Sequence, residues 1–488
     1  MKYILSIDQG TSSTRCIVFD EEGNQKGISQ IEHKQIYPNE GWVEHDPIEI
    51  KENVLKTMSD AKKDANIDWN SIKSIGITNQ RETVVAWNKK TGNVLHNAIV
   101  WQCRRTAGKI NELKKENYEN IFHEKTGLVL DAYFSGTKMG WLLDHSQKVI
   151  DQKNDLAFGT IDSWIIYFLT GQHVTDASNA SRTLLYNLKT NQWDSELSEI
   201  LKVPIDTLPT VNSNCESPFG IYKIEGVEIP IFGVLGDQQA ALFGQAGFKT
   251  GSVKSTYGTG NFILQNTGSA ISYSASGLLT TIGWQIGNDV NYAMEGSVFV
   301  TGAALQWLRD NVGVFSNYIE FDELADTVEN AGEVIFVPAL AGLGAPYWDS
   351  SARGSIFGIT RATTKGHLIH ATLDSIAYQT NEVIELMESE SQTRIPDIRV
   401  DGGITQSKLM LQKQANVSQK PVVKPRNTET TALGAAMIAG YKLIWDSFDE
   451  LSQINPPTET IQPEKPTEYS SHQHQQWKKA IQRSRDWI

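Results

Sequence analysis

The sequence contains very little cysteine. Cys16, Cys103 and Cys215 are the three cysteines among 488 residues, and no two of them have the short spacing of a zinc-binding pair. Such sparse and widely separated thiols are typical of proteins that work in a reducing compartment, where disulfides do not persist. We therefore expect a cytoplasmic protein without a disulfide framework.

Long apolar runs are also missing. The longest compact one, residues 164–169, is far shorter than the roughly 20 residues that a membrane-spanning helix needs. The apolar stretch at the N-terminus reaches Asp8 too early for the core of a signal peptide. We expect a soluble protein with no membrane insertion.

The sequence lacks an excess of positive charge. Lys and Arg number 44 against 57 Asp and Glu, which makes the formal net charge −13. A nucleic-acid partner is therefore not expected, and an anionic substrate would need a local cationic site. The composition, 40% hydrophobic and 21% charged, is that of an ordinary globular protein. At about 150 residues per domain the length predicts about three domains, and two large domains or a pair of nested halves fit equally well.

The common nucleotide-binding motifs are absent too. The sequence has no P-loop, and no Gly-x-Gly-x-x-Gly stands between a predicted strand and a helix. Two polar turns offer backbone N–H groups and hydroxyls instead: one lies between predicted strands at 3–7 and 16–19, the other between strands at 253–257 and 261–264. Each turn is either an ordinary β-turn or an anion-binding nest. Because both halves begin with this strand–turn–strand pattern, we predict a duplicated α/β unit with a cleft between the copies.

Other elements follow from local patterns. Asp46 and Pro47 are typical of the start of a helix, and residues 72–78 read as a strand. Residues 83–87 and 94–101 are predicted to pair as a hairpin. The proline-rich stretch 456–466 is expected to be a surface connector before a terminal helix ending near Ile488.

Adjacent opposite charges follow the strand predicted at 72–78. Arg81 and Glu82 are either a solvated pair or a polyol-binding pair, because guanidinium donates and carboxylate accepts hydrogen bonds. Trp101 and Tyr133 would then supply an apolar wall and a phenolic donor, although aromatic residues more often belong to the core.

Two aspartates follow predicted strands. Asp237 comes after the apolar run 229–235 and is either a helix N-cap or a general base that accepts a hydroxyl proton. Asp8 ends the first strand and either caps its own turn or holds Mg²⁺, directly or through water.

Several motifs together resemble those of the FGGY carbohydrate kinases, and among them the members that act on glycerol. The resemblance covers essentially the whole chain, and the joint occurrence of the motifs in order is far more specific than any one of them. They lie at residues 8–11, 41–46, 76–83, 101–102, 133–142, 236–240, 257–260, 344–349 and 354–374.

The resemblance implies an α/β fold of two actin-like (ribonuclease-H-like) domains with an interdomain cleft. Residues 1–245 would bind glycerol and carry the first phosphate turn, and residues 246–488 would carry the second turn and bind adenosine. ATP and Mg²⁺ would be the cofactors, and the chain would assemble as a homodimer or homotetramer.

The resemblance also assigns individual residues, with Asp237 as the catalytic base. The implied glycerol ligands are Arg81, Glu82, Trp101, Tyr133, Asp237, Gln238 and Phe262. The implied nucleotide ligands are Thr11, Ser12, Ser13, Arg15, Thr259, Gly302, Gln306, Gly403 and Ser407. Asp8, directly or through water, and Asp237 would hold the metal.

The chain departs from the family pattern at a few positions. Ala132 stands where proline is usual, Asn261 where a small residue or cysteine is common, and Ser407 where the family has an asparagine near adenine. Some members bind regulators in the segment before the 236–240 motif, through a phosphorylatable histidine or an arginine-containing loop for fructose 1,6-bisphosphate. Residues 220–230 contain neither histidine nor arginine, so we expect neither form of control.

Two alternatives to glycerol phosphorylation stay open. A kinase of the same fold for another small polyol or sugar, such as xylulose or gluconate, would share most motifs. A non-enzymatic actin-like ATP switch would explain the two turns, but it would give no task to Arg81, Glu82, Trp101 and Asp237 together.

Overall fold

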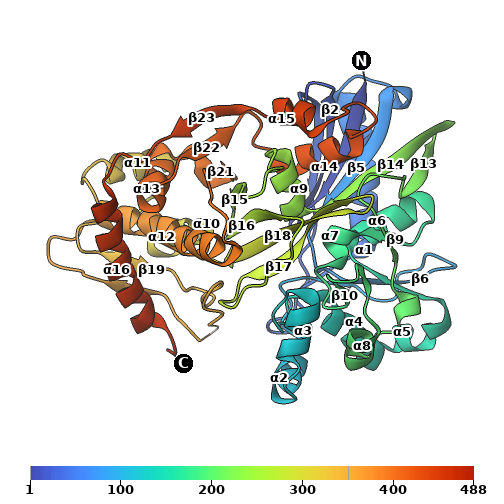
Figure 1. Ribbon diagram of the computed structural model, residues 1–488, viewed down its shortest axis with the longest axis horizontal. Helices are drawn as coiled ribbons and strands as arrows, with labels where there is room; N and C mark the ends of the chain where they lie inside the picture. The colour runs from blue at the N-terminus through green and yellow to red at the C-terminus, as the bar shows by residue number, and fades with distance from the viewer. Residues whose placement is uncertain (1, 350, 488) are drawn as a thin grey trace.

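The computed structural model, which describes residues 2–349 and 351–487, has two halves that lie side by side (Figure 1). The first half is built on a six-stranded sheet with the order β13-β14-β5-β1-β2-β3. Its strands are β1 (Tyr3–Gln9), β2 (Ser13–Asp20), β3 (Gln25–Glu32), β5 (Ile72–Asn79), β13 (Gly220–Ile224) and β14 (Val227–Gly236).

The second half is built on a seven-stranded sheet with the order β17-β18-β16-β15-β21-β22-β23. Its strands are β15 (Val253–Tyr257), β16 (Asn261–Gly268), β17 (Leu279–Ile286), β18 (Asp289–Val298), β21 (Ile398–Asp401), β22 (Val422–Pro425) and β23 (Pro457–Ile461).

The two sheets share one topology. In the first, β3, β2 and β1 are antiparallel neighbours, and β5 and β14 continue the sheet in parallel to β1. In the second, β18, β16 and β15 are antiparallel neighbours, and β21 and β22 continue it in parallel to β15. The predicted duplication of an α/β unit is therefore confirmed, and in both copies the polar turn joins the first two strands.

Helices and short strand pairs surround these sheets. The helices of the first half and its edge are α1 (Pro47–Asp64), α2 (Ala107–Lys115), α3 (Glu119–Thr126), α4 (Ser135–His145), α5 (Gln147–Asp151), α6 (Ile161–Thr170), α7 (Ala177–Ala180), α8 (Ser195–Leu201) and α9 (Asp237–Gly244). Those that follow are α10 (Gly302–Trp307), α11 (Tyr318–Ala325), α12 (Lys365–Ser391), α13 (Lys408–Ser418), α14 (Thr430–Gly440), α15 (Phe448–Ile454) and α16 (Thr467–Ser484). The short pairs are β4 (Glu44–His45) with β7 (Ala98–Ile99), β6 (Val85–Asn88) with β8 (Leu156–Gly159), β9 (Val174–Asp176) with β12 (Thr210–Asn212), β10 (Tyr186–Asn187) with β11 (Gln192–Trp193), and β19 (Ile335–Val337) with β20 (Ser355–Phe357).

Helix α14 belongs to the second half by sequence but packs on the first sheet, where its red ribbon lies beside β5 in Figure 1. The Ser6 hydroxyl of β1 donates to the carbonyl of Ala432 at 2.7 Å, across 426 residues of chain. Glycine is required at position 434, because a Cβ there would lie 1.8 Å from the carbonyl oxygen of Ala240 in α9. This close approach of α9 and α14 joins the halves, and the division at 245/246 stays a prediction.

One local prediction is confirmed and another was wrong. Residues 83–87 and 94–101 face each other antiparallel through the bridges Val84–Ile99 and Trp87–Val94, while β6 also pairs with β8 and β7 with β4. The stretch 456–466 is not merely a connector, since it contains the edge strand β23, in which Pro457 takes the first position. The terminal helix α16 ends at Ser484, and Ile488 lies outside the described residues.

Among the described residues, no helix combines the length and the apolar character that crossing a membrane requires.

Candidate active site

Three parallel strands of the first sheet end together. Gln9 of β1 and Gly236 of β14 are both in register with Asn79, the last residue of β5. Ligands of open α/β sheets bind beyond the carboxyl ends of such strands. Asp8 lies at the end of β1, Arg81 and Glu82 follow β5, and Asp237 follows β14, so residues predicted from distant motifs meet at one edge.

Asp237 is the first residue of α9. The N-cap is Gly236, so the carboxylate is not a side-chain cap of that helix. Its Oδ1 accepts from the backbone N–H of Gln238 at 2.7 Å and lies 3.1 Å from Nε of Arg81. Desolvation raises the pKa of Asp237, while the charges of Arg81 and Lys254 oppose that rise. The side chain is 29% exposed and thus open to a ligand.

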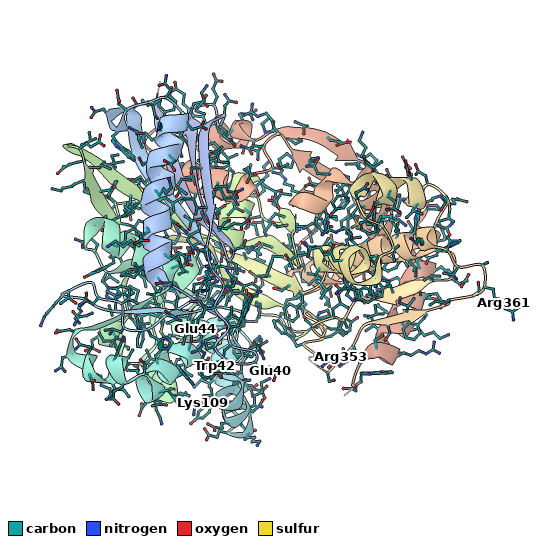
Figure 2. The ribbon with its side chains drawn as sticks, turned by 180° about the vertical axis from the view of Figure 1, so that it is seen from behind. Glu40, Trp42, Glu44, Lys109, Arg353 and Arg361 are labelled. Atoms are coloured by element: carbon teal, nitrogen blue, oxygen red, sulfur yellow. The ribbon has the colours of Figure 1, made fainter. Side chains whose placement is uncertain are left out.

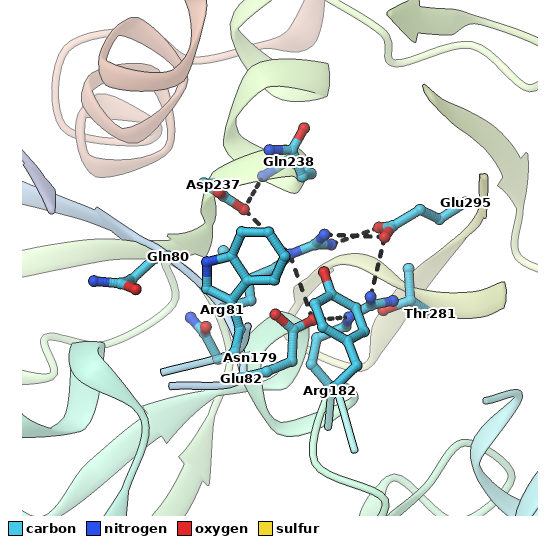
Figure 3. A network of polar contacts seen from close by, with 12 residues as sticks. Gln80, Arg81, Glu82, Asn179, Arg182, Asp237, Gln238, Thr281 and Glu295 are labelled. Atoms are coloured by element: carbon cyan, nitrogen blue, oxygen red, sulfur yellow. Dashed lines mark hydrogen bonds and ion pairs between the residues drawn. The ribbon is translucent and has the colours of Figure 1, made fainter. Parts of the chain in front are cut away.

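Arg81 and Glu82 are not a solvated pair, because their side chains are each 2% exposed. Arg81 instead forms a two-pronged ion pair with Glu295 of β18, with N–O distances of 2.5 and 3.0 Å (Figure 3). Glu82 accepts from Nε of Arg182 at 2.6 Å, and Nη2 of Arg182 donates to Glu295 at 3.0 Å. Two guanidinium groups and two carboxylates therefore form a closed network that joins the halves.

The charges of this network balance locally. Burial raises the pKa of Glu295, but Arg182 and Arg81 outweigh it and hold that pKa at about 2. Burial raises the pKa of Glu82, against the opposing charges of Arg182 and Arg81. Glu295 thus takes up most of the positive charge of Arg81, which leaves Asp237 a better proton acceptor than a carboxylate paired only with Arg81 would be.

Sequence reasoning missed Arg182, Glu295 and Lys254. All three side chains are fully buried, with exposed fractions of 0%. Glu295 and Lys254 each interrupt a run of residues that otherwise reads as a buried strand. A charged residue in such a strand must find a partner or a function, and that signal was available in the sequence.

The predicted aromatic wall is assembled from both halves. The ring of Trp101 lies edge-on to Tyr133 at 5.5 Å and to Phe262 of β16 at 6.3 Å between centroids. The indole N–H of Trp101 donates to the Thr11 hydroxyl at 2.9 Å. This bond links the wall directly to the first polar turn.

The first turn joins β1 to β2 and contains Thr11, Ser12 and Ser13. It is closed by a bond from the N–H of Gly10 to the carbonyl of Ser13 at 2.9 Å. Arg15 lies opposite Asp8 in the strand register, and its guanidinium contacts the Asp8 carboxylate at 2.6 Å and Glu429 at 2.5 Å. Asp8 therefore pairs with Arg15 rather than capping its own turn.

The second turn joins β15 to β16 and exposes Thr259. The Thr259 carbonyl accepts from the backbone N–H groups of Thr301 and Ala303, which holds the start of α10 against the turn. A Cβ on Gly302 would lie 2.5 Å from the carbonyl oxygen of Gly258, so only glycine allows this approach. Thr259 and Gly302, two of the nucleotide ligands predicted in the second half, therefore lie together at this turn.

Three further predicted nucleotide ligands lie on α10 or between β21 and α13. Gln306 is exposed, one helical turn after Gly302 on α10. Gly403 follows β21 and faces open space. The Ser407 hydroxyl is the N-cap of α13 and accepts from the backbone of Met410 at 3.2 Å. That structural role accounts for a serine at this position without an adenine contact.

The donor set suits a magnesium ion that is held partly by substrate. Within residues 2–349 and 351–487, no three His, Cys, Asp or Glu side chains cluster so as to hold a metal by themselves. Asp8 and Asp237 each bind arginine through one carboxylate oxygen. Mg²⁺ commonly takes one or two carboxylates plus phosphate oxygens and waters, and these two residues fit that pattern.

A cavity of about 550 Å³ lies between the halves. One wall comes from α3 and residues 129–131, and the other from residues 274–277 and Trp348. Among the described residues that line this cavity, none is a predicted glycerol or nucleotide ligand.

Comparison with known proteins agrees with this geometry. Residues 3–244 match the N-terminal domain, and residues 253–443 the C-terminal domain, of the FGGY family of carbohydrate kinases. The chain belongs to this family. It is 50% identical to glycerol kinase 2 of Thermotoga maritima over 493 residues, which cover 100% of this chain and 99% of the relative. It is also 50% identical to the glycerol kinase of Thermococcus onnurineus, covering 100% and 98% of the two chains.

A solved FGGY kinase has nearly the same fold. The crystal structure of Plasmodium falciparum glycerol kinase with ADP superposes with a TM-score of 0.93 at 38% identity, covering 99% of this chain and 98% of that one. The predicted fold of two actin-like domains is thus confirmed. Xylulose kinase from Lactobacillus acidophilus, at 23% identity and a TM-score of 0.88, shares the fold alone.

Two of the FGGY motif positions have structural roles here. Trp42 and Glu44, labelled in Figure 2, hold Arg105: its guanidinium lies 4.0 Å from the Trp42 ring centre and 2.6 Å from the Glu44 carboxylate. Asn261 accepts from the Ser255 hydroxyl at 2.9 Å and donates to Thr380 at 2.9 Å. Asn261, which replaces the small residue or cysteine common in the family, therefore anchors the β15–β16 hairpin to α12. Phe262 still reaches the aromatic wall.

Proposed function

We propose that this FGGY kinase is a glycerol kinase. It transfers the γ-phosphoryl group of ATP to glycerol and forms sn-glycerol 3-phosphate and ADP, the first step of glycerol catabolism. The observation that carries the proposal is the convergence of Arg81, Glu82 and Asp237 beside the wall of Trp101, Tyr133 and Phe262. Such a site offers donors and acceptors for neighbouring hydroxyls and an apolar surface for a short carbon skeleton.

In the proposed mechanism Asp237 accepts the proton of the terminal hydroxyl as that oxygen attacks the γ-phosphorus. Arg81 orients this carboxylate through Nε, and Glu295 keeps Arg81 fixed by binding its other nitrogens. Arg81 and Glu82 hold the remaining hydroxyls. Phosphoryl transfer depends mostly on positioning and electrostatics, so the rigidity of this network is itself catalytic support.

The nucleotide is proposed to span the two polar turns. Thr11, Ser12, Ser13 and Arg15 serve the phosphates from the first half, and Thr259, Gly302, Gln306, Gly403 and Ser407 line the nucleotide from the second. Asp8 and Asp237 would hold Mg²⁺, which would supply positive charge to offset that of the phosphates. Closure of the halves, taken as domains 1–245 and 246–488, would exclude water that otherwise hydrolyses ATP.

We also propose that the enzyme acts in the cytoplasm as a homodimer or homotetramer. Light scattering on the purified chain measures the assembly directly.

One experiment tests the function. ADP formation is measured with ATP and Mg²⁺ alone, and then with glycerol, xylulose or gluconate added. The proposal expects ADP release that depends on glycerol and is much weaker with the two larger substrates. Preference for a sugar would identify a related FGGY kinase, and ADP release that ignores every acceptor would indicate an ATP switch; either result overturns the proposal.

A further inference from the structure

Lys254 is a buried cation at the centre of the site, and no step described so far uses it. It lies in β15, and its side chain is fully buried. Its ammonium donates to Oε1 of Gln238, to the Thr256 hydroxyl at 3.1 Å and to the carbonyl of Phe262 at 3.0 Å. An ammonium has three donors, so each has a partner.

Two of these partners are predicted glycerol ligands on different elements. Gln238 belongs to α9, which follows the first sheet, and Phe262 belongs to β16 of the second sheet. Phe262 is in register with Thr256, the third partner. One ammonium therefore fixes the polar and the apolar side of the proposed glycerol site relative to each other.

The contact with Lys254 also decides how the Gln238 amide is oriented. An ammonium donates and never accepts, so the atom that faces Lys254 must be the carbonyl oxygen Oε1. The NH₂ group of Gln238 then faces away from Lys254. Among the described residues none accepts a hydrogen bond from this NH₂ group, and Gln238 as a whole is 8% exposed.

The charges around Lys254 are consistent with a fixed cation. Burial lowers its pKa to about 8, although Asp401, Glu295 and Asp237 act in the opposite direction. In return Lys254 is, after Arg81, a charge that opposes the rise in the pKa of Asp237. The ammonium thus acts on the proposed base as well as on Gln238.

We propose that Lys254 is a positioning residue that holds Gln238 with its NH₂ group toward the substrate, so that this amide only donates hydrogen bonds to a glycerol hydroxyl. The proposal rests on the proposed function and deepens it, because it makes one hydroxyl of the substrate an acceptor at Gln238. That hydroxyl's own proton is then free to be given to a carboxylate such as Asp237.

The first test separates binding of the two substrates. Lys254→Met keeps the length of the side chain and removes its donors, and Lys249→Met removes an exposed lysine five residues earlier as the control. We expect Lys254→Met to raise the KM for glycerol by about 3- to 10-fold, the effect of one lost hydrogen bond, with little change in the KM for ATP. Equal changes in both constants, or none in either, would overturn the positioning role.

A double-mutant cycle tests whether Lys254 acts through Gln238. Gln238→Leu removes the amide, and the double variant Lys254→Met/Gln238→Leu should raise the glycerol KM no further than Gln238→Leu alone. Independent, multiplying effects would show that Lys254 does not act through this side chain and would overturn the proposal.

Gln238→Glu tests the direction of the hydrogen bond, and it remains informative if Lys254→Met does not fold. A carboxylate can still accept from Lys254, so the variant should unfold at the wild-type temperature or above it. It has no N–H to give to glycerol, and its glycerol KM should rise at least as much as in Gln238→Leu. An unchanged glycerol KM would overturn the proposal.

Failure of the proposed function is separate from failure of this inference. If the wild-type chain shows no glycerol-dependent ADP release, both fall. If wild type is active and the Lys254 and Gln238 variants keep its glycerol KM, only the inference falls.

Discussion

The Nε atom of Arg81 lies 3.1 Å from Oδ1 of Asp237, so a predicted glycerol ligand and the proposed base are joined directly. Arg81 is 2% exposed, whereas Asp237 is 29% exposed. The guanidinium is thus a fixed support, and the carboxylate is the member of the pair that a substrate can reach. This arrangement explains why the two residues, 156 positions apart in the chain, belong to one site.

Replacement of the proposed base should abolish most catalysis and leave the fold intact. Asp237→Asn keeps the size of the side chain and its bond from the Gln238 backbone, but it cannot accept the hydroxyl proton. We expect turnover to fall by about 10²- to 10⁴-fold, the usual contribution of a general base. Steady-state kinetics and thermal unfolding check this together, and near wild-type turnover in a folded variant would contradict the assignment.

Arg81→Ala should harm both glycerol binding and stability. The substitution leaves Glu295 buried without one of its two guanidinium partners, and breaking a buried ion pair costs about 3–5 kcal/mol of unfolding free energy. Glycerol affinity should fall much more than affinity for an ATP analogue. Denaturant unfolding and calorimetry with each ligand make the two measurements.

Arg104→Ala is the matched control for Arg81→Ala. Arg104 also pairs with a carboxylate, that of Asp131 at 2.5 Å, but its side chain is 50% exposed. An exposed pair contributes about 0–1 kcal/mol, so this variant should stay close to wild type in stability. Equal destabilisation by the two substitutions would contradict the importance that we give to the buried network.

Asp162→Asn should stabilise the protein above acidic pH. Asp162 is fully buried and accepts from the hydroxyls of Thr160 and Thr175 at 2.5 and 2.6 Å. Burial, and then the nearby carboxylate of Asp176, raise the pKa of Asp162 above its ordinary value of 3.8. The folded protein therefore binds a proton there that the unfolded chain releases, and this stabilisation is lost as the pH rises from acidic toward neutral.

Asparagine is neutral at every pH and keeps groups that can bond to both threonines. The unfolding free energy of Asp162→Asn should exceed that of wild type by about 1 kcal/mol or more at pH 8, and the difference should shrink toward pH 4. Denaturant titrations at the two pH values measure it. A variant that is less stable than wild type at pH 8 would show that Asp162 functions as a charged group.

The enzyme should be insensitive to fructose 1,6-bisphosphate and to phosphorylation by a phosphocarrier protein. Residues 220–230 form most of the β13–β14 hairpin, whose turn is Glu225 and Gly226, and they contain no histidine or arginine. The one cation of this segment, Lys223, is paired with Glu228 at 2.8 Å. A bisphosphate would find net negative charge there. Activity that changes several-fold in either assay would contradict this prediction.

The sequence by itself determined the features that depend on local patterns and on short motifs. The strands on either side of the two polar turns, the helix that starts at Pro47 with Asp46 as its cap, and the strands before Arg81 and Asp237 follow from side-chain periodicity and capping chemistry. The strand–turn–strand pattern at the start of the first half recurs in the second half, and this repetition also indicated a duplicated unit. Residue roles taken from the family resemblance remain predictions until the variants are measured.

Only the tertiary structure decided which distant residues complete the site. Glu295 and Lys254 come from the second sheet and Arg182 from the segment after α7, and each is fully buried beside a partner from the other half. The same holds for α14, which leaves its own half to pack on β1 and β5. A local pattern shows that a charged residue lies in a strand, but its partner is set by how sheets and helices pack, since the energy of a buried charge depends on the group placed opposite it.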